Sequence, residues 1–498
     1  MLKQEHVKLF MNVWFGFVLL LFAVSIFAFE MNPITDIAGT DNGVFAYIGE
    51  GMRHGLMPYR DMFDHKGPLL YIINWAGMSM GIGYAGVWII DILMYLLSFG
   101  FALFTFSRIL GRKNTLLAAV PIIWIFIHLF CCGNMTESYA TYVTLVAWSL
   151  FVRDINDDKL GLFTCFVQGV AVGAILLLRP NMIGFAIPVI VYCFGDLIQN
   201  KGIKQFFIRC ASGVVGIMIV VLPICAWMMM LGILDDCWDC YIKFNLLYLA
   251  KNKYTVTPEI LLPSIVTIVN IWLIKISEGK KRRLLQINLI YLLSAFGIVL
   301  MKLTYEHYYL PILPAMMVPL VCIYDGNRGR IIGFLRVLIL PLAAIFIIYW
   351  PVTLIINVRK LVTSVIKLQM PVIERRISPK EETYRQLRDL IGEDETVCTM
   401  GCPSIYYKIK RRCNSKYFYT FITCWDGEKI PPICDNLKAG VDDYVLLYKD
   451  KRPADAVMEC ISQYYMEYAT VGDYTVMKFK GAATTPQERS GENPTISL

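Results

Sequence analysis

Charged residues are scarce in this chain. Only 17 % of its 498 residues are Asp, Glu, Lys or Arg, whereas 57 % are hydrophobic. This balance is far from that of an ordinary soluble domain. The charges that are present gather between long apolar runs, a pattern typical of polytopic membrane proteins.

The first apolar run, residues 9–29, contains no charge at all. At about 1.5 Å per residue, it would span roughly 30 Å as a helix, which is the thickness of a bilayer core. A cleavage site of small residues is also absent, because the sequence continues with Glu-Met-Asn-Pro at 30–33. The run therefore predicts a retained anchor and not a removed signal peptide.

Other missing features exclude further classes. The sequence shows no repeat of fixed period and no inverted halves with matching broken helices, which argues against a secondary transporter. The glycine-rich 81–86 segment has no βαβ surroundings, so it does not predict a nucleotide site. The net charge of +8 does not indicate a nucleic-acid partner, because the basic residues lie in alternate connectors, as membrane topology requires.

Apolar runs and their flanks predict a polytopic α-helical membrane protein with about eleven spans. The predicted spans are 9–29, 86–107, 115–131, 138–152, 162–178, 182–198, 210–231, 259–276, 284–300, 310–324 and 337–356. One set of connectors carries eighteen Lys and Arg residues and the other carries eight. The richer set is predicted to be cytoplasmic, which places the N-terminus inside and the C-terminal region outside.

The composition changes near residue 374, where a small extracytoplasmic α/β domain is expected to begin. It should contain a helix capped by Ser378-Pro379 and running to about 391, a helical segment at 454–468, and strands at 396–400, 444–448 and 474–479. Its six cysteines allow fifteen pairings, among which the sequence does not choose. The predicted organisation is a transmembrane domain at 1–356 with an outer segment at 30–85, a linker at 357–373, the α/β domain at 374–481 and a disordered tail at 482–498.

The stretch 41–68 of the outer segment has more ionisable side chains than a connector needs. Asp41 follows the first span, where a carboxylate could act as general base toward an acceptor hydroxyl; alternatively it caps a helix over 42–51. Asp64, His65 and Lys66 lie beside a turn. The potentially cationic groups of His65 and Lys66 could stabilise an anionic phosphate as it leaves. Alternatively, Lys66 could contact lipid headgroups.

Three more polar groups interrupt apolar runs on the same predicted face. Glu137 follows a tight turn and could bind an acceptor, hold a metal or pair with Arg179. Arg179 could clamp phosphate or snorkel to the interface. His307 could contact phosphate or a metal, although it and Glu306 are too few ligands to establish one. The tyrosines around them, including Tyr308, also fit an ordinary aromatic belt.

With these residues identified, the chain resembles the GT-C fold glycosyltransferases that use lipid-linked sugars. It resembles in particular the bacterial members related to protein O-mannosyltransferases and to lipid A aminoarabinose transferase. The resemblance covers roughly residues 10–320 and is strongest in the first outer segment. There Asp41 is followed by a Gly-x-x-Pro-Tyr step ending at Tyr59 and by the His-Lys-Gly-Pro turn at 65–68. Further signatures are GNMTE at 133–137, LRPN at 178–181 and HYY at 307–309.

The resemblance implies inverting transfer of a sugar from a polyprenyl-phosphate donor to an acceptor hydroxyl on the outer face, with Asp41 as base. The residues that would hold the phosphate are Lys66, Arg179 and His307. Supporting or acceptor-binding residues would be Glu137, His65, Tyr59, Asp64, Glu306 and Tyr308.

One departure is Asn42, where many relatives carry a second acid. The need for a divalent cation stays open, as does the acceptor, which could be lipid, glycan or protein. The rival hypotheses are a transporter or flippase of lipid-linked sugars and a non-catalytic membrane scaffold.

Overall fold

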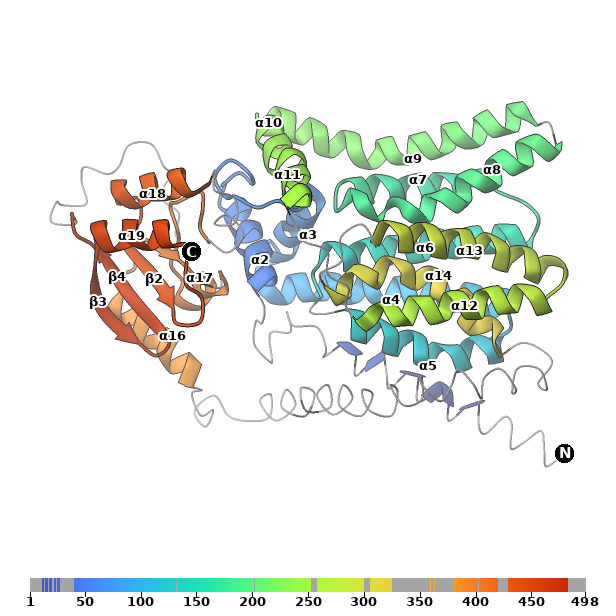
Figure 1. The fold of residues 1–498 in the computed structure, drawn as a ribbon, viewed down its shortest axis with the longest axis horizontal. Coiled ribbons are helices and arrows are strands. Elements are labelled where there is room, and N and C mark those ends of the chain that lie inside the picture. The colour runs from blue at the N-terminus through green and yellow to red at the C-terminus, as the bar shows by residue number, and fades with distance from the viewer. Residues whose placement is uncertain are drawn as a thin grey trace.

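Long apolar runs become long helices in the computed structural model (Figure 1). The structure describes residues 40–130, 133–200, 202–251, 258–299, 305–324, 379–401, 403–419 and 429–481, together with 359, 362 and short pieces of 11–26. The helices of the bundle are α4 Tyr84–Ile109, α5 Arg112–Leu129, α6 Thr136–Asn156, α7 Leu162–Leu176, α8 Ala186–Asn200, α9 Ile203–Met230, α12 Leu261–Ile276, α13 Gly279–Val299 and α14 Leu313–Cys322.

These nine helices overlap nine of the predicted spans. Among the described residues, five helical stretches are long and apolar enough to cross a membrane. They are Tyr84–Ile109, Arg112–Leu129, Pro180–Gln199, Ile203–Met230 and Pro258–Ile276. The total of eleven spans stays a prediction, because the 337–356 span and much of the 9–29 span lie outside the described residues.

Helices α7 and α9 pack closely because glycines line their contact. A Cβ atom at Gly169 would overlap the main-chain carbonyl of Gly213, and one at Gly216 would overlap that of Phe166. Small residues allow backbones to approach in this way, which is the usual means of helix association in a membrane. The other side of α9 exposes large apolar side chains such as Leu222, which is 53 % exposed. An apolar face of this kind suits contact with lipid.

The outer segment 30–85 contains more regular structure than a connector. The helix expected over 42–51 is present as α2 Thr40–Arg53. A second helix, α3 Pro68–Met78, was not predicted. Pro68 starts it because the fixed φ of proline and its missing N–H are both accepted at the first helical position.

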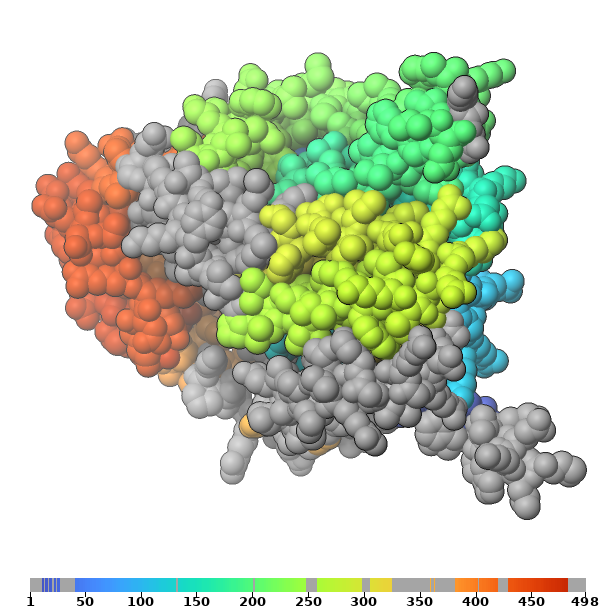
Figure 2. Space-filling view, turned by 45° about the vertical axis from the view of Figure 1, so that its right-hand side comes forward, coloured from blue at the N-terminus to red at the C-terminus, as the bar shows by residue number. Residues whose placement is uncertain are grey.

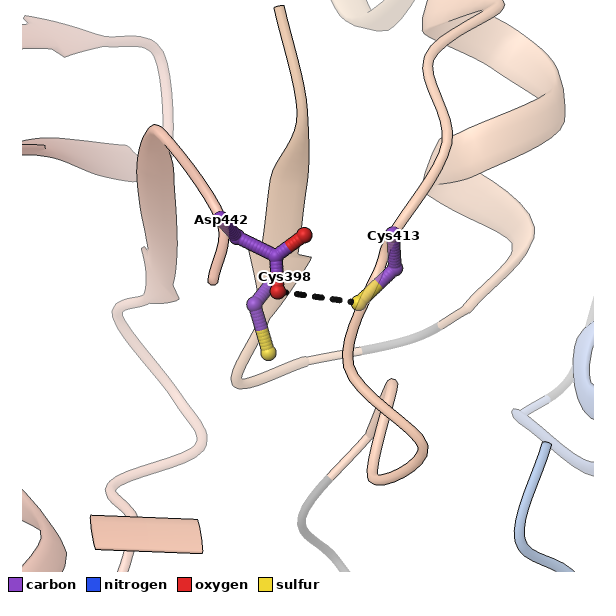
Figure 3. A group of neighbouring side chains, drawn as sticks. All are labelled: Cys398, Cys413 and Asp442. Carbon is purple, nitrogen blue, oxygen red and sulfur yellow. Dashed lines mark hydrogen bonds between the residues drawn. The ribbon is translucent and has the colours of Figure 1, made fainter. Parts of the chain in front are cut away.

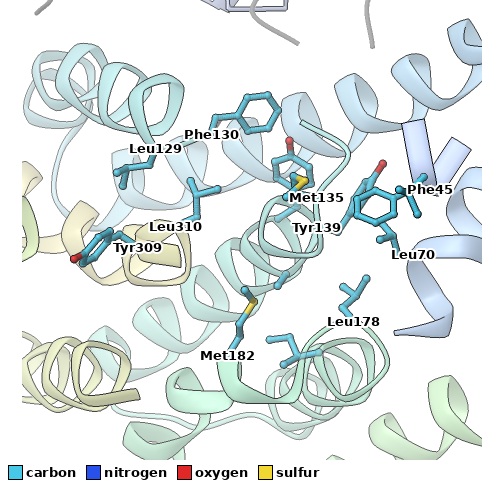
Figure 4. Close-up of a cluster of buried hydrophobic side chains, with 14 of the residues drawn as sticks. Phe45, Leu70, Leu129, Phe130, Met135, Tyr139, Leu178, Met182, Tyr309 and Leu310 are labelled. Carbon is cyan, nitrogen blue, oxygen red and sulfur yellow. The ribbon is translucent and has the colours of Figure 1, made fainter. Parts of the chain in front are cut away.

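The connectors that the sequence places on the same face as this segment also form short elements, and several of them lie beside α2 and α3 (Figure 1). They are η1 Pro180–Phe185, α10 Leu234–Cys237, the π-helix η2 Trp238–Lys243, α11 Phe244–Lys251, η3 Pro258–Ile260 and η4 Glu306–Ile312. A buried cluster that includes Phe45, Leu70, Tyr139, Met182 and Tyr309 joins α2 and α3 to α6, η1 and η4 (Figure 4). This core fixes connectors that are distant in the sequence against one another.

The C-terminal region is a small α/β domain, as predicted. Its elements are α16 Pro379–Leu390, β1 Val397–Thr399, α17 Ser404–Ile409, α18 Ile430–Ala439, β2 Tyr444–Tyr448, α19 Asp455–Tyr464, β3 Tyr465–Val471 and β4 Tyr474–Phe479. The sheet order is β1-β2-β4-β3; β1 and β2 are parallel, and the other pairs are antiparallel.

The predicted helical segment 454–468 is wrong in its second part. The helix α19 ends at Tyr464, and the chain continues as β3, which forms an antiparallel pair with β4. This strand is rich in aromatic and β-branched residues, so pairing with β4 outweighs helix continuation. The Ser378 cap and the 482–498 tail lie outside the described residues, as does the 357–373 linker except for residues 359 and 362.

The α/β domain lies at one end of the molecule (Figures 1 and 2), where it packs on the outer segment (Figure 1). The ring of Tyr47 in α2 lies 4.6 Å from the Tyr406 ring and 4.5 Å from the Phe418 ring, measured between centroids. The main-chain N–H of Phe63 donates to the Lys416 carbonyl at 2.9 Å. The domain is therefore in direct contact with the segment that carries the candidate site.

Candidate functional site

Asp64 is the most strongly bonded acid of the outer segment. It is 1 % exposed, and two hydroxyls donate to its carboxylate: Tyr71 to Oδ2 at 2.7 Å and Tyr419 to Oδ1 at 2.9 Å. Nδ1 of His65 lies 3.2 Å from Oδ1. Both Tyr71 in α3 and Tyr419 in the α/β domain thus converge on one carboxylate, which ties the two regions together.

The charge state of this group follows from its neighbours. Burial alone would raise the pKa of Asp64, but the His65 imidazole, the positive charge of Lys66 and the Tyr71 hydroxyl lower this pKa to about 2. For His65, burial and the Lys66 charge lower the pKa below its usual value. At neutral pH, Asp64 is therefore ionised and His65 is neutral, so Asp64 is an anchor and a poor proton donor.

The backbone around Lys66 is held by three side chains. The Tyr59 hydroxyl donates to the Lys66 carbonyl at 2.8 Å, and the Lys66 N–H donates to the Tyr71 hydroxyl at 3.1 Å. The Asn245 amide, from α11, donates to the His65 carbonyl at 2.6 Å. The Lys66 ammonium itself forms no ion pair with any described residue. The turn therefore presents an ammonium without a direct ion pair among those residues, on a fixed backbone.

The same turn is joined to the segment that precedes Arg179. The Gly67 N–H donates to the Leu178 carbonyl at 3.3 Å, and the Leu69 N–H donates to the Leu177 carbonyl at 3.1 Å. A Cβ atom at position 67 would overlap the Leu177 carbonyl, so only glycine permits this approach. Lys66 and Arg179 consequently belong to two backbones that are fixed against each other.

Arg179 forms an ion pair with Glu137, whose side chain is fully buried. The guanidinium carbon lies 4.0 Å from the centroid of the Tyr308 ring, and Nε2 of His307 lies 3.8 Å from Glu137 Oε1. The sequence left open whether Glu137 pairs with Arg179, and the structure shows that it does. Because Arg179 already neutralises Glu137, this carboxylate is poorly suited to binding a metal.

His307 is buried and lies in the electrostatic field of both Arg179 and Lys66. Burial, the charge of Arg179 and the charge of Lys66 lower its pKa to about 3. The imidazole is therefore neutral at physiological pH and can offer an N–H hydrogen bond, but no charge. Arg179 and His307 both approach Glu137, and the backbone beside Lys66 is bonded to the segment before Arg179, so the three residues predicted to bind phosphate lie in one region.

Asp41 lies in the first turn of α2, which begins at Thr40. It is therefore inside the helix and not ahead of it, and its charge there is favourable to the helix dipole. Its side chain is half-buried and forms no hydrogen bond with another described residue. Its charge nevertheless acts on His65 and Tyr419. Both side-chain amide atoms of the adjacent Asn42, which is 1 % exposed, also lack a hydrogen-bond partner among the described residues.

One predicted residue stays apart. Glu306 is exposed and forms no hydrogen bond or ion pair with the described residues. Tyr308 and Tyr59 are in the site as structural supports, one against Arg179 and the other on the Lys66 carbonyl. An aromatic belt alone would not have distinguished these roles.

Sequence reasoning missed the residues that position the 133–137 turn. The side-chain amides of Asn74 and Asn134 donate to each other at 3.0 Å, and the Asn134 N–H donates to Asp91 Oδ2 at 2.7 Å. The Tyr142 hydroxyl also donates to Asp91, at 2.9 Å to Oδ1, so this acid of α4 pairs within the bundle. Nothing in the sequence connects Asn74, Asn245 or Tyr419 with the site, because their partners are distant along the chain.

Comparison with known structures and families places this geometry in context. The chain is similar to ArnT from Cupriavidus metallidurans bound to undecaprenyl phosphate, with 13 % identity, a TM-score of 0.63, and coverage of 96 % of this chain and 99 % of that chain. The apo state of the same protein gives 13 % identity, a TM-score of 0.59, and coverage of 95 % and 98 %.

A third likeness is to the oligosaccharyltransferase AglB from Archaeoglobus fulgidus in complex with an inhibitory peptide and a dolichol-phosphate. It has 13 % identity, a TM-score of 0.47, and coverage of 95 % and 75 %.

The likeness to ArnT confirms the GT-C fold and the polytopic helical class with its small C-terminal sheet. No curated protein matches the sequence. A family model matches residues 2–333 of the 498, which is two thirds of the chain. On that match, the chain belongs to the family described as the putative competence-induced protein Ccs4 N-terminal domain.

Proposed function

We propose that this protein is a membrane glycosyltransferase that moves a sugar from a polyprenyl-phosphate donor to an acceptor hydroxyl on the outer face of the membrane. The observation that carries the proposal is the convergence of Lys66, Arg179 and His307 beside the helix of Asp41. It is supported by the fold, because ArnT, which shares it, was solved bound to undecaprenyl phosphate.

The charges of the site suit a leaving phosphate. Lys66 and Arg179 supply two cations, and Glu137 is the one carboxylate paired directly with them among the described residues. The Lys66 ammonium has no ion-pair partner among the described residues, so it is available to the phosphate, and neutral His307 can donate a hydrogen bond to it. Groups already in place as charge develops lower a barrier more than groups that must reorganise.

Asp41 is the group we assign as general base. It accepts the proton of the acceptor hydroxyl while that oxygen attacks the anomeric carbon from the side opposite the phosphate. The new C–O bond forms as the bond to the phosphate oxygen breaks, and that oxygen retains the electron pair. The anomeric configuration is thereby inverted. The absence of a hydrogen bond to Asp41 from the described residues leaves its carboxylate available for this task.

A transfer assay tests the proposal. Purified protein in detergent is given a polyprenyl-phosphate sugar, and release of the sugar is measured for the wild type, Asp41→Asn and a control, Asp239→Asn. Asp239 is an exposed acid of another outer connector. We expect release by the wild type and the control and loss in Asp41→Asn. Equal release by all three, or none by the wild type, would sink the catalytic assignment; a flippase would bind the donor without releasing its sugar.

The orientation is tested separately. Asp61, which lies in the outer segment, is replaced by cysteine and labelled with a membrane-impermeant thiol reagent. We expect labelling from outside intact cells, because the connectors richest in Lys and Arg are predicted to be cytoplasmic. Labelling solely from the cytoplasmic side would reverse the assignment of the face.

A further inference from the structure

Two cysteines and one aspartate of the α/β domain meet in its interior (Figure 3). Cys398 lies on β1, Cys413 follows α17, and Asp442 precedes β2. All three are buried, and their two sulfurs and a carboxylate oxygen lie within 4.8 Å of one another. It is the one group of three or more metal-ligating side chains in the part of the chain that the structure describes.

The spacing suits a shared cation. Sγ of Cys413 lies 3.4 Å from Oδ2 of Asp442. A tetrahedral zinc ion with usual bond lengths to sulfur and oxygen would separate two such ligand atoms by about 3.5 Å. A disulfide would instead need the sulfurs about 2 Å apart, and it would leave the buried Asp442 carboxylate without a thiol partner. In Figure 3 the Cys413 sulfur and this carboxylate oxygen point toward each other, with the Cys398 sulfur beside them.

A hydrogen bond from a neighbouring residue orients the Asp442 carboxylate. The Asn414 N–H donates to Asp442 Oδ1 at 2.7 Å, which directs Oδ2 to the thiols. Such outer hydrogen bonds are typical of metal-binding carboxylates. The present contacts of the thiols with carbonyls are long, 3.8 Å from Cys398 to Tyr417 and 3.6 Å from Cys413 to Ser415, so they cost little to replace.

From this geometry we propose that Cys398, Cys413 and Asp442 bind a thiophilic divalent cation, namely Zn²⁺. Binding would release the two thiol protons, and each sulfur would supply one electron pair to the metal, with no change of oxidation state. Three protein ligands leave one tetrahedral position for water. The proposal concerns the α/β domain and does not depend on the transferase assignment.

The location gives the ion a role in joining the two domains. The Tyr47 hydroxyl, from α2, accepts a hydrogen bond from the Cys413 N–H at 3.1 Å and donates to the Cys413 carbonyl at 3.3 Å. A few residues further along the same segment, Tyr419 reaches Asp64. A cation at Cys413 would therefore fix the segment that contacts both α2 and the Lys66 turn.

Metal analysis of the full chain tests this inference. The protein is purified in detergent, equilibrated with micromolar ZnCl₂, passed over a weak chelating resin and analysed by mass spectrometry for zinc. We expect about one zinc per chain, with loss of most of it in Cys413→Ser and Asp442→Asn. Cys460→Ser serves as the matched control, because Cys460 lies on α19 outside the cluster; it should retain the zinc.

A second measurement needs no variant and therefore no assumption about folding. Wild-type protein loaded with Co²⁺ should show a sulfur-to-cobalt charge-transfer band, which thiolate ligation produces and carboxylate ligation does not. Wild type without zinc and without this band would overturn the proposal. So would a Cys398–Cys413 disulfide found by peptide mapping without reductant, or full zinc content in Cys413→Ser.

Discussion

Asp64 and Asp41 belong to the same outer segment, yet their surroundings are opposite. Asp64 is buried and receives two phenolic hydroxyls and an imidazole contact. Asp41 is half-buried and hydrogen-bonds to none of the described side chains. The contrast separates an acid that holds structure from one that we propose acts on a substrate, although the sequence presents both simply as loop aspartates.

The difference also shows that a cluster of ionisable residues in the sequence does not by itself locate the catalytic group. The turn around Asp64 looks catalytic because acid and base side chains are adjacent, but the partners found in space occupy them. Only the Lys66 ammonium of that turn is left without an ion-pair partner among the described residues. Positioning and chemistry are thus divided between residues that are neighbours in the sequence.

The largest effect is expected for Asp41→Asn. If this variant kept full activity, the proposed difference between Asp41 and Asp64 would be wrong. Loss of a general base typically costs about 10²–10⁴-fold in rate, whereas the fold should not change, because no hydrogen bond to another described side chain is removed. The measurements are the rate of sugar transfer and the midpoint of thermal unfolding in detergent. A large fall in the midpoint would mean that Asp41 is also structural.

The reverse pattern is expected for Asp64→Ala. Removing this carboxylate leaves the Tyr71 and Tyr419 hydroxyls without their acceptor in the interior, which should cost about 3 kcal/mol of stability. The midpoint of thermal unfolding should therefore fall. Asp239→Ala, on an exposed side chain, is the control and should leave it unchanged. If both variants unfold alike, the anchor role of Asp64 is wrong.

Acid should weaken the same anchor. The pKa of Asp64 is lowered to about 2 in the folded protein from 3.8. Its stabilising contribution is therefore complete above about pH 4 and is lost as the pH falls toward 2, with a magnitude of about 2 kcal/mol. We expect the unfolding midpoint of Asp64→Asn to depend less on pH than that of the wild type across this window. Identical pH profiles would contradict the assigned charge state.

The smallest effect is expected for Tyr419→Phe. It removes one of the two hydroxyls that reach Asp64 while keeping the ring, so about 1 kcal/mol of stability should be lost. Tyr468→Phe, an exposed tyrosine of the same domain, is the matched control. Limited proteolysis should also show easier cleavage near the domain contact in Tyr419→Phe alone. If the two variants behave alike, the Tyr419 hydroxyl does not contribute to the Asp64 anchor.

Much of the helical fold could be predicted, because an apolar run long enough to span a bilayer has few other conformations available. The elements that were missed are those that depend on distant contacts. The strand β3 follows α19 directly, and only its pairing with β4 distinguishes it from further helix. The helix α3 is apolar but too short for a span, so hydropathy assigned it to a connector.

The candidate site was predictable only in part. Ionisable side chains at a membrane boundary are energetically costly, so the sequence alone indicated Glu137, Arg179 and His307 as candidate site residues. The contact between Tyr419 and Asp64 joins residues 355 positions apart, and no periodicity or spacing could connect them. The meeting of Cys398 and Cys413 with Asp442 was likewise hidden among fifteen equally allowed pairings.

The main-chain hydrogen bonds between Gly67 and Leu178 and between Leu69 and Leu177 have a consequence for engineering. They join two connectors from different parts of the chain into one structural unit. A chimaera that imports the first connector of a relative should therefore import the segment before Arg179 as well. Exchanging one without the other would pair two backbones whose shapes and hydrogen-bonding groups do not match.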